Sequence, residues 1–271
     1  FKKELGNQFI DVGIAEEHAI AYASGLAKNG AKPVIGIHSS FIQRTYDQLS
    51  QDLAINKNPA VILVYRSGIS GGNVTHLGMF DIPLISNIPN LVYLAPTCKK
   101  ECISMLEWGI EQTDYPVIIR VPNTEAVERN IDIENNYSKL NKYKVEENGK
   151  KVAIIALGNF YELGKKVKNM LKEQKNIDAT LINPRYITGI DEKLLQELKQ
   201  NHEIVITLED GVLDGGFGEK ISRFYGNSKM KVLNFGAIKE FTDRESLKEL
   251  YKRYHLTEEL IMKDILSTIE E

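Results

Sequence analysis

The chain has 271 residues, of which 42% are hydrophobic and 26% are charged, and its formal net charge is −3. This length and composition fit about two globular domains, each with its own core. The nearly balanced charge predicts neither a nucleic acid nor a membrane surface as a partner. The longest uncharged hydrophobic run, Ile82–Cys98, contains three prolines, so no membrane-spanning helix is predicted.

The two cysteines, Cys98 and Cys102, are too few for a disulfide framework and indicate a reducing, cytoplasmic compartment. No signal peptide is visible. The sequence begins at Phe1 instead of methionine, within a passage from helix to strand. We therefore expect it to be a fragment or processed piece of a longer protein.

Short hydrophobic runs alternate with longer amphipathic segments along the whole chain. The hydrophobic runs predict strands at Phe9–Val12, Pro33–Ile37, Ala60–Tyr65, Leu91–Ala95, Val117–Val121, Val152–Leu157, Ala179–Ile182, Ile204–Leu208 and Val232–Phe235. The amphipathic segments predict helices at Glu16–Lys28, Tyr46–Ile55, Lys99–Gln112, Leu163–Glu173, Leu194–His202 and Leu247–Tyr254.

This alternation is typical of βαβ units, in which parallel strands form a sheet that helices cover on both faces. We therefore predict an α/β protein of two three-layer α/β/α domains with mostly parallel sheets. A polar stretch separates the halves, which predicts a first domain at 1–122, a linker at 123–150 and a second domain at 151–271. Ligands of such domains bind at the carboxyl ends of the strands.

Residues 11–18, Asp-Val-Gly-Ile-Ala-Glu-Glu-His, pass through a glycine turn into a helix that begins with Glu16 and Glu17. These acids either complement the helix dipole or direct one carboxylate into a cleft. Adjacent helical side chains diverge by about 100°, so both acids cannot face the same ligand atom.

Residues 37–48 again lead from a strand end into a helix. Phe41 is either a core aromatic or a ligand contact, and Arg44 either pairs with Asp47 on the helix surface or serves the same site. Residues 66–78 are rich in Gly, Ser and Thr, which suits a mobile loop around a small-molecule site.

Two weaker patterns carry no chemistry. The glycines at 211–218 lack the spacing of a dinucleotide motif, so a tight structural loop is predicted there. Cys98 and Cys102 lack the partner His or Cys residues of a zinc site.

Taken in order, these clusters resemble one family. Asp-Val-Gly-Ile-Ala-Glu-Glu-His (11–18), Ser-Ser-Phe-Ile-Gln-Arg-Thr-Tyr-Asp-Gln (39–48) and Arg-Ser-Gly through Thr-His-Leu-Gly-Met-Phe-Asp (66–81) are similar to motifs of the 1-deoxy-D-xylulose-5-phosphate synthases, thiamine-diphosphate enzymes of the transketolase group. Leu-Glu-Asp-Gly at 208–211 matches more weakly. The resemblance implies a pyrimidine-binding domain, truncated at its amino end, followed by the family's C-terminal domain.

The resemblance also implies how the cofactor is held. Glu16 would hydrogen-bond the ring nitrogen of the aminopyrimidine and favour the imino form that takes the C2 proton, as catalytic residue and cofactor ligand. Phe41 would stack on the pyrimidine, with His38 and Arg44 beside it.

Substrate binding is implied for Arg66, Arg44 and His76, and His76 would also act as a catalytic proton donor or acceptor. Three departures from the family matter. His38 stands where the family usually has Tyr, and the loop before His76 is one residue short and lacks an acid. Asn123 replaces the Arg that would hold the phosphate of the acceptor, which leaves the acceptor sugar open.

The implied cofactors are thiamine diphosphate and Mg²⁺. In the family, an amino-terminal domain with a Gly-Asp-Gly motif binds the diphosphate and the metal, and this sequence has no such segment. We therefore expect the chain to be inactive without that domain or subunit and to act in a homodimer, with no metal ligand of its own.

The leading hypothesis is a carboligase that joins the two-carbon unit of pyruvate, after loss of CO2, to glyceraldehyde 3-phosphate, a step of isoprenoid biosynthesis. Three alternatives stay open. One is a transketolase-type transfer of a two-carbon ketol unit between sugars. The others are the β subunit of a 2-oxoacid dehydrogenase and a non-catalytic regulatory module of the same fold.

Overall fold

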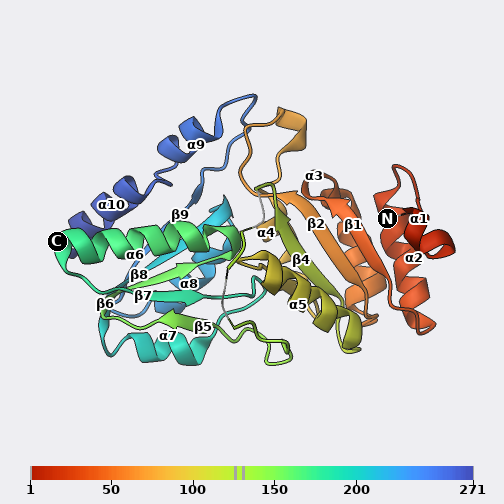
Figure 1. Cartoon of the computed structure of the whole chain (residues 1–271), viewed down its shortest axis with the longest axis horizontal. Helices are drawn as coiled ribbons and strands as arrows, with labels where there is room; N and C mark the ends of the chain where they lie inside the picture. The colour runs from red at the N-terminus through yellow and green to blue at the C-terminus, as the bar shows by residue number, and fades with distance from the viewer. Residues whose placement is uncertain (1, 125–126, 130–131, 271) are drawn as a thin grey trace.

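The computed structural model describes residues 2–124, 127–129 and 132–270. Two α/β halves lie side by side, and the two ends of the chain lie at opposite ends of the molecule (Figure 1). Each half contains a sheet whose strands are all or mostly parallel, so the predicted fold class is confirmed.

The first sheet has four parallel strands in the order β1-β2-β4-β3. Its strands are β1 Val34–His38, β2 Val61–Ser67, β3 Val92–Leu94 and β4 Val117–Pro122. The helices of this half are α1 Lys2–Leu5, α2 Glu16–Lys28, α3 Ser39–Ile42, α4 Asp81–Ile85 and α5 Lys99–Glu111, with short 3-10 turns at η1 Gly6–Gln8, η2 Gln43–Thr45 and η4 Val74–His76 and a π-helix, η3, at Gln48–Ala54.

The second sheet has five strands in the order β5-β7-β6-β8-β9, of which only β5 runs antiparallel to its neighbour. Its strands are β5 Lys144–Glu147, β6 Lys151–Ala156, β7 Thr180–Asn183, β8 His202–Val212 and β9 Lys231–Ala237. The helices are α6 Tyr161–Lys175, α7 Glu192–Leu198, α8 Phe217–Tyr225, α9 Leu247–Arg253 and α10 Glu258–Glu270, after the turn η5 Gly158–Phe160.

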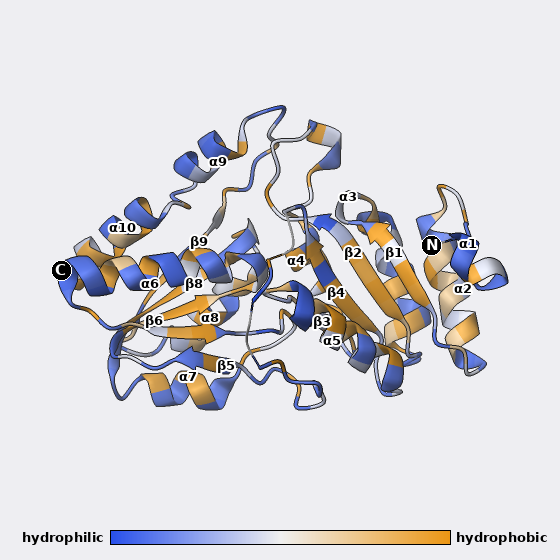
Figure 2. Ribbon diagram, in the orientation of Figure 1, coloured by the Kyte–Doolittle hydropathy of each residue, from blue (hydrophilic) through white to orange (hydrophobic). Residues whose placement is uncertain are grey.

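The strands form where they do because their hydrophobic runs are buried from both sides. The central strands β2, β6 and β8 appear as hydrophobic bands in Figure 2, whereas the helices show hydrophilic outer faces. In α2 the buried residues recur at helical spacing and are mostly small, namely Ala19, Ile20, Ala23, Ser24 and Ala27. This face lets α2 pack closely on its neighbours, which fixes the position of its first turn.

The two halves share buried structure. Hydrophobic residues of the first half, such as Tyr93, belong to the same core cluster as Ile155 and Phe217 of the second half. The chain after β7 also extends the first sheet, because the Ala95 amide donates to the Arg185 carbonyl and the Ile187 amide donates to the Tyr93 carbonyl. The halves therefore pack as a single body.

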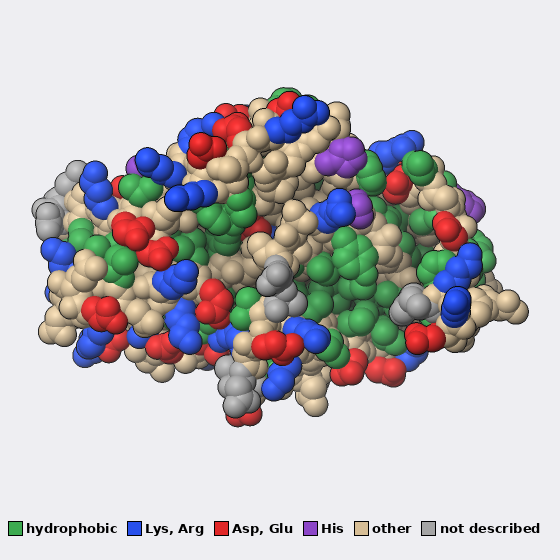
Figure 3. Space-filling model, turned by 45° about the horizontal axis from the view of Figure 1, so that its top comes forward, with side chains coloured by type: hydrophobic (Ala, Val, Ile, Leu, Met, Phe, Trp, Pro, Cys, Tyr) green, Lys and Arg blue, Asp and Glu red, His purple; other side chains and the backbone are tan. Residues whose placement is uncertain are grey.

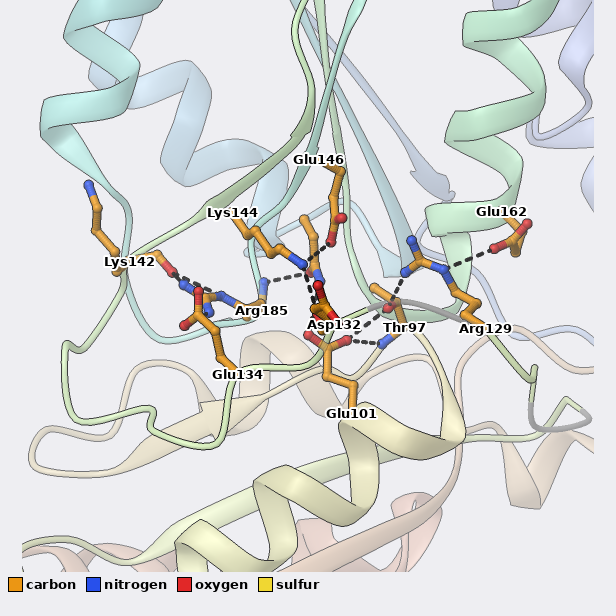
Figure 4. A network of polar contacts seen from close by, with 11 residues as sticks. Thr97, Glu101, Arg129, Asp132, Glu134, Lys142, Lys144, Glu146, Glu162 and Arg185 are labelled. Carbon is orange, nitrogen blue, oxygen red and sulfur yellow. Dashed lines mark hydrogen bonds and ion pairs between the residues drawn. The ribbon is translucent and has the colours of Figure 1, made fainter.

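A buried polar network reinforces this junction (Figure 4). Glu101, at the start of α5, accepts hydrogen bonds from the amide and hydroxyl of Thr97 and from the side-chain amide of Asn183 in β7. The Arg185 guanidinium donates twice to the carbonyl of Lys142. Glu101 thus ties α5 of the first half to β7 of the second, and Arg185 holds the chain before β5.

Some predicted elements differ from the structure. The strand predicted at Phe9–Val12 is wrong, because these residues form no strand and the side chain of Ile10 is half-exposed. The helix predicted at Tyr46–Ile55 is a π-helix, with the Ile55 amide bonded to the Ser50 carbonyl five residues earlier. The strand β5 lies inside 123–150, where a linker was predicted.

The helix predicted at Leu194–His202 ends at Leu198, because strand β8 already begins at His202. The sequence patterns also left out α10, which packs against α6. Within the described residues, no helix is long and hydrophobic enough to cross a membrane.

Candidate active site

The predicted site residues gather at the carboxyl ends of the parallel strands in the first sheet. His38 ends β1 and lies in register with Tyr65, the residue before Arg66 in β2. The amide of Asn123, directly after β4, donates to the carbonyl of Ser67 at the end of β2. Three neighbouring strands thus deliver polar residues to one edge, where parallel α/β sheets bind ligands.

Glu16 begins α2 and is the most enclosed acid of the site, with 13% of its side chain exposed. Its Oε2 atom is buried and has no hydrogen-bond partner in the described structure. The nearest cation is the guanidinium of Arg44, whose Nη1 lies 3.6 Å away. A buried carboxylate oxygen without a donor is costly in free energy unless a ligand supplies one.

Glu17 behaves differently although it is the next residue. Its side chain is 37% exposed, and its Oε1 lies 3.3 Å from Nε of Arg44. Arg44 therefore bridges both acids, and the two carboxylates reach different nitrogens of the same guanidinium. Both acids thus share the Arg44 guanidinium, but Oε2 of Glu16 accepts no hydrogen bond within the described residues.

Three aromatic rings, those of His38, Phe41 and His76, contact one another at the same site. The ring of His38 is stacked on Phe41, with centroids 5.7 Å apart and planes 4° from parallel. His76 meets the same ring edge-on at 5.5 Å. Because Phe41 is only partly buried, its ring can still offer a face to a planar ligand.

The charge on His38 depends on these neighbours. Burial lowers the pKa of His38 below its usual 6.5, and the positive charge of Arg66 and the proximity of His76 lower it further. His38 is therefore a neutral imidazole at pH 7, able to accept a hydrogen bond.

Arg66 precedes a loop that turns sharply and carries His76. Arg66 has a φ of 53° and Gly68 a φ of 101°, so the chain turns sharply as it leaves β2. Gly78 closes the loop close to Arg66, because a Cβ on Gly78 would lie 2.0 Å from the Arg66 carbonyl oxygen. At the tip, the Thr75 hydroxyl contacts Nδ1 of His76 at 2.8 Å and orients its ring.

Figure 3 shows histidine and Lys or Arg side chains close to hydrophobic ones on one face of the first half. The described residues contain no group of three or more His, Cys, Asp or Glu side chains that could hold a metal ion.

Sequence reasoning missed a buried ionic group behind this site. Arg120 in β4 forms a 2.7 Å ion pair with Asp81, which also accepts the hydroxyl of Tyr93. A further Arg120 nitrogen donates to the carbonyl of Asp210, at 2.6 Å, in β8 of the second half. The sequence signal for this group was a charged residue inside an otherwise hydrophobic strand, as with Arg120 in β4 and Asp210 in β8. Charged residues are rarely buried without partners, so each of them predicts an ion pair or hydrogen bond.

The chain is similar to known proteins along most of its length. Residues 1–127 match the family model of the transketolase pyrimidine binding domain, and residues 141–261 match that of the transketolase C-terminal domain. The chain is 38% identical over 269 residues to a 1-deoxy-D-xylulose-5-phosphate synthase of Clostridium tetani, covering 98% of this chain and 43% of the relative. It is 36% identical over 272 residues to that of Pseudoalteromonas translucida, covering 99% and 43%.

The chain therefore spans less than half the length of these curated relatives. Among solved structures, it has the fold of a split-gene transketolase described as an inactive β4 tetramer. The TM-score is 0.83 at 22% sequence identity, and the match covers 98% of this chain and 85% of the other.

Proposed function

This chain belongs to the transketolase family, and on that premise we propose that it binds the pyrimidine ring of thiamine diphosphate and the substrate in a carboligase of the 1-deoxy-D-xylulose-5-phosphate synthase type. The observation that carries this proposal is the buried Oε2 of Glu16, which accepts no hydrogen bond from any described residue and lies 3.6 Å from the Arg44 guanidinium. A protonated ring nitrogen of the cofactor is a donor of the kind this oxygen lacks. The residues present therefore fit the cofactor.

The roles of the individual residues follow from their surroundings. Glu16 holds a proton shared with the pyrimidine ring, and Phe41 provides the apolar face against which that ring packs. His38, stacked on Phe41 and neutral, accepts a hydrogen bond at the same edge. Arg44 lies 3.6 Å from Glu16 and keeps its carboxylate oriented.

When bound, thiamine diphosphate supplies a carbon nucleophile for addition to a substrate carbonyl. The chain's contribution to the substrate comes from Arg66 and His76. Arg66 offers a planar, permanently charged group that suits the carboxylate of pyruvate. His76 is exposed at the tip of its loop and can donate a proton to an oxygen of the substrate or take one from it.

The proposed overall reaction joins pyruvate and glyceraldehyde 3-phosphate with loss of CO2. A transfer of a two-carbon ketol unit between sugars is the second candidate. Asn123 favours it, because this residue lies beside the end of β2 and has no charge with which to hold the phosphate of an acceptor. The name of the structural neighbour, a transketolase, is compatible with either reaction.

We propose that a further domain or subunit binds the diphosphate and Mg²⁺, and that the active assembly is a homodimer of such pairs. The greater length of the curated relatives supports a further domain, and the assembly named for the structural neighbour supports an oligomer. The proposed division of this chain is 1–122, 123–150 and 151–271. A cytoplasmic location is proposed from the two free thiols, Cys98 and Cys102.

The test is CO2 release from pyruvate by the chain together with a diphosphate-binding half of a relative, with thiamine diphosphate and Mg²⁺ present. Release that depends on glyceraldehyde 3-phosphate supports the carboligase. Ketol transfer from a donor sugar, without CO2 release, supports the second candidate. The absence of both reactions, with the cofactor bound, indicates a non-catalytic module.

The acceptor site is tested by Asn123→Arg, with Asn123→Gln as the matched control. A restored charge-assisted hydrogen bond to phosphate is worth about 1.5–3 kcal/mol, so the acceptor KM of Asn123→Arg should fall about tenfold or more. Asn123→Gln should leave it unchanged. Equal KM values in the two variants would remove Asn123 from the acceptor site.

A further inference from the structure

The loop between Gly68 and Gly78, here called loop 68–78, carries His76 and has few contacts with its own half of the molecule. Its base is closed by one carbonyl, that of Gly78, which accepts the Gly68 amide at 2.9 Å and the Ser39 hydroxyl at 2.8 Å. Its composition, rich in Gly, Ser and Thr, gives it no intrinsic preference for one shape.

The second half of the molecule makes the other long-range backbone contacts of the loop. In Figure 1 the loop lies next to the segment between β9 and α9. There the Gly72 carbonyl accepts the Arg244 amide at 2.9 Å, and the Val74 amide donates to Asp243 at 3.2 Å. A side chain on Gly71 would collide with the Glu245 carbonyl, 2.2 Å from a Cβ. The tip of the loop thus follows residues 243–245 closely.

Two apolar residues of the loop are buried in the same direction. Ile69 is 3% exposed and Leu77 is 7% exposed, and both belong to a hydrophobic cluster that otherwise comes largely from the second half. The exposed His76 is therefore carried by a loop whose inner side packs against the second half.

Asp210 holds the base of the loop. Its Oδ1 accepts the Ile69 amide at 2.9 Å, and its Oδ2 accepts the side-chain amide of Asn159 at 2.8 Å. The contact is close enough that a Cβ on Gly68 would lie 2.0 Å from Oδ2. Asp210 is 1% exposed.

This carboxylate is costly to bury. Burial raises the pKa of Asp210 to about 6, although the charge of Arg120 and the bonds from Ile69 and Asn159 favour the ionised form. An apolar residue would fill the same space without this cost. What Asp210 adds is an acceptor aimed at the backbone of the loop.

We propose that Asp210 and residues 243–245 are positioning elements that the second domain supplies to the active site: they fix loop 68–78 and thereby the place of His76. The part of this inference that concerns turnover rests on the proposed function. The part that concerns the loop stands on the contacts alone.

The first test measures amide exchange by NMR on the full chain. In Asp210→Ala, the Ile69 amide loses a hydrogen bond to a charged acceptor, and its exchange should accelerate by about 10- to 100-fold. The matched control is Asp191→Ala. Asp191 is also a buried acid of the second half, but it accepts the Tyr143 amide and caps α7. This control should destabilise the second half. The exchange rate of the Ile69 amide, divided by that of the β2 amides, should stay as in the wild type.

The conservative variant separates the acceptor from the charge. In Asp210→Asn, the side-chain oxygen still accepts the Ile69 amide. Once the Asn159 side chain flips, its Oδ1, which is buried and accepts no hydrogen bond from any described residue, can accept the new amide group. Wild-type exchange at Ile69 and unchanged His76 ring signals are expected here, whereas Asp210→Ala should shift or broaden the His76 signals.

Equal acceleration in Asp210→Ala and Asp191→Ala, or unmoved His76 signals in Asp210→Ala, would overturn the proposal. If Asp210→Ala does not fold, Asp243→Ala decides, since Asp243 is exposed. It should speed exchange of the Val74 amide by about 2- to 10-fold and shift the His76 signals. No change at either group would also overturn the proposal.

Turnover is measured separately, in the complemented enzyme. Asp210→Ala should lower kcat for pyruvate at least tenfold with an unchanged KM for thiamine diphosphate, and Asp210→Asn should restore most of it. A wild-type assembly without any turnover would count against the proposed function, while the exchange and His76 signals would still decide whether the second domain holds the loop.

Discussion

At the scale of single residues, the site depends on which of two adjacent acids faces the ligand. Both acids form ion pairs with Arg44. Within the described residues, the buried Oε2 of Glu16 accepts no hydrogen bond, whereas Glu17 is more exposed. The helical geometry predicts that the two diverge, but the sequence alone does not decide which one points inward. That choice follows from how α2 packs its Ala-rich face.

The environment of His38 leads to a prediction about charge. Because Arg66 lowers the pKa of His38, the neutral variant Arg66→Gln should raise that pKa toward 6.5, although burial keeps it from reaching that value. Arg66→Lys keeps the charge and should leave the pKa close to that of the wild type. NMR titration of the imidazole measures all three proteins, and identical titrations in both variants would show that Arg66 does not act on His38.

At the scale of elements, the start of α8 depends on one buried acid. Glu209 lies in β8, and its two oxygens accept the amides of Phe217 and Gly218 at 2.8 and 2.7 Å. The sequence predicted a tight loop at 211–218. It did not predict that Glu209 of the preceding strand would cap α8, because Glu209 lies eight and nine residues before the two amides that it accepts.

Glu209 should make folding stability depend on pH. Burial raises its pKa to about 7, against an ordinary 4.5, even though both amides favour the ionised form. The folded chain thus binds this proton more tightly than the unfolded chain. Its stabilising contribution is full below about pH 4.5 and is lost as the pH rises through about 7, a change of up to about 3 kcal/mol.

Urea unfolding between pH 4.5 and 7.5 tests this prediction. Glu209→Gln cannot titrate, so its unfolding free energy should fall less steeply with rising pH than that of the wild type. Glu219→Gln, on the exposed side of α8, is the matched control and should follow the wild type. Parallel curves for the wild type and Glu209→Gln would contradict the prediction.

At the scale of the whole molecule, the alternation of hydrophobic runs predicted all but one of the described strands of the two sheets. The missing strand was β5, whose sequence is mostly charged. The strand predicted at Phe9–Val12 failed because a hydrophobic run needs a neighbouring strand to pair with. Contacts between the halves join residues that are far apart in the sequence. Asp210 and Ile69, for example, are 141 residues apart, so no local sequence pattern predicts their hydrogen bond.

The link between the halves can be weakened at one position. Arg120 is 3% exposed and bonds to Asp81 and to the carbonyl of Asp210. Arg120→Met leaves the charge of Asp81 buried and unpaired, so the free energy of unfolding should fall by about 3–5 kcal/mol. The exposed pair of Lys32 and Glu111 gives the control, because Lys32→Met should cost less than about 1 kcal/mol. Equal losses in denaturant unfolding would contradict this account.

If Glu16 serves the pyrimidine ring, it controls how fast the C2 proton of thiamine diphosphate exchanges for deuterium. The measurement uses the chain complemented with a diphosphate-binding half. We expect Glu16→Gln to slow this exchange at least about 100-fold and Glu17→Gln to stay within a few-fold of the wild type. Exchange at the wild-type rate in Glu16→Gln would contradict the account.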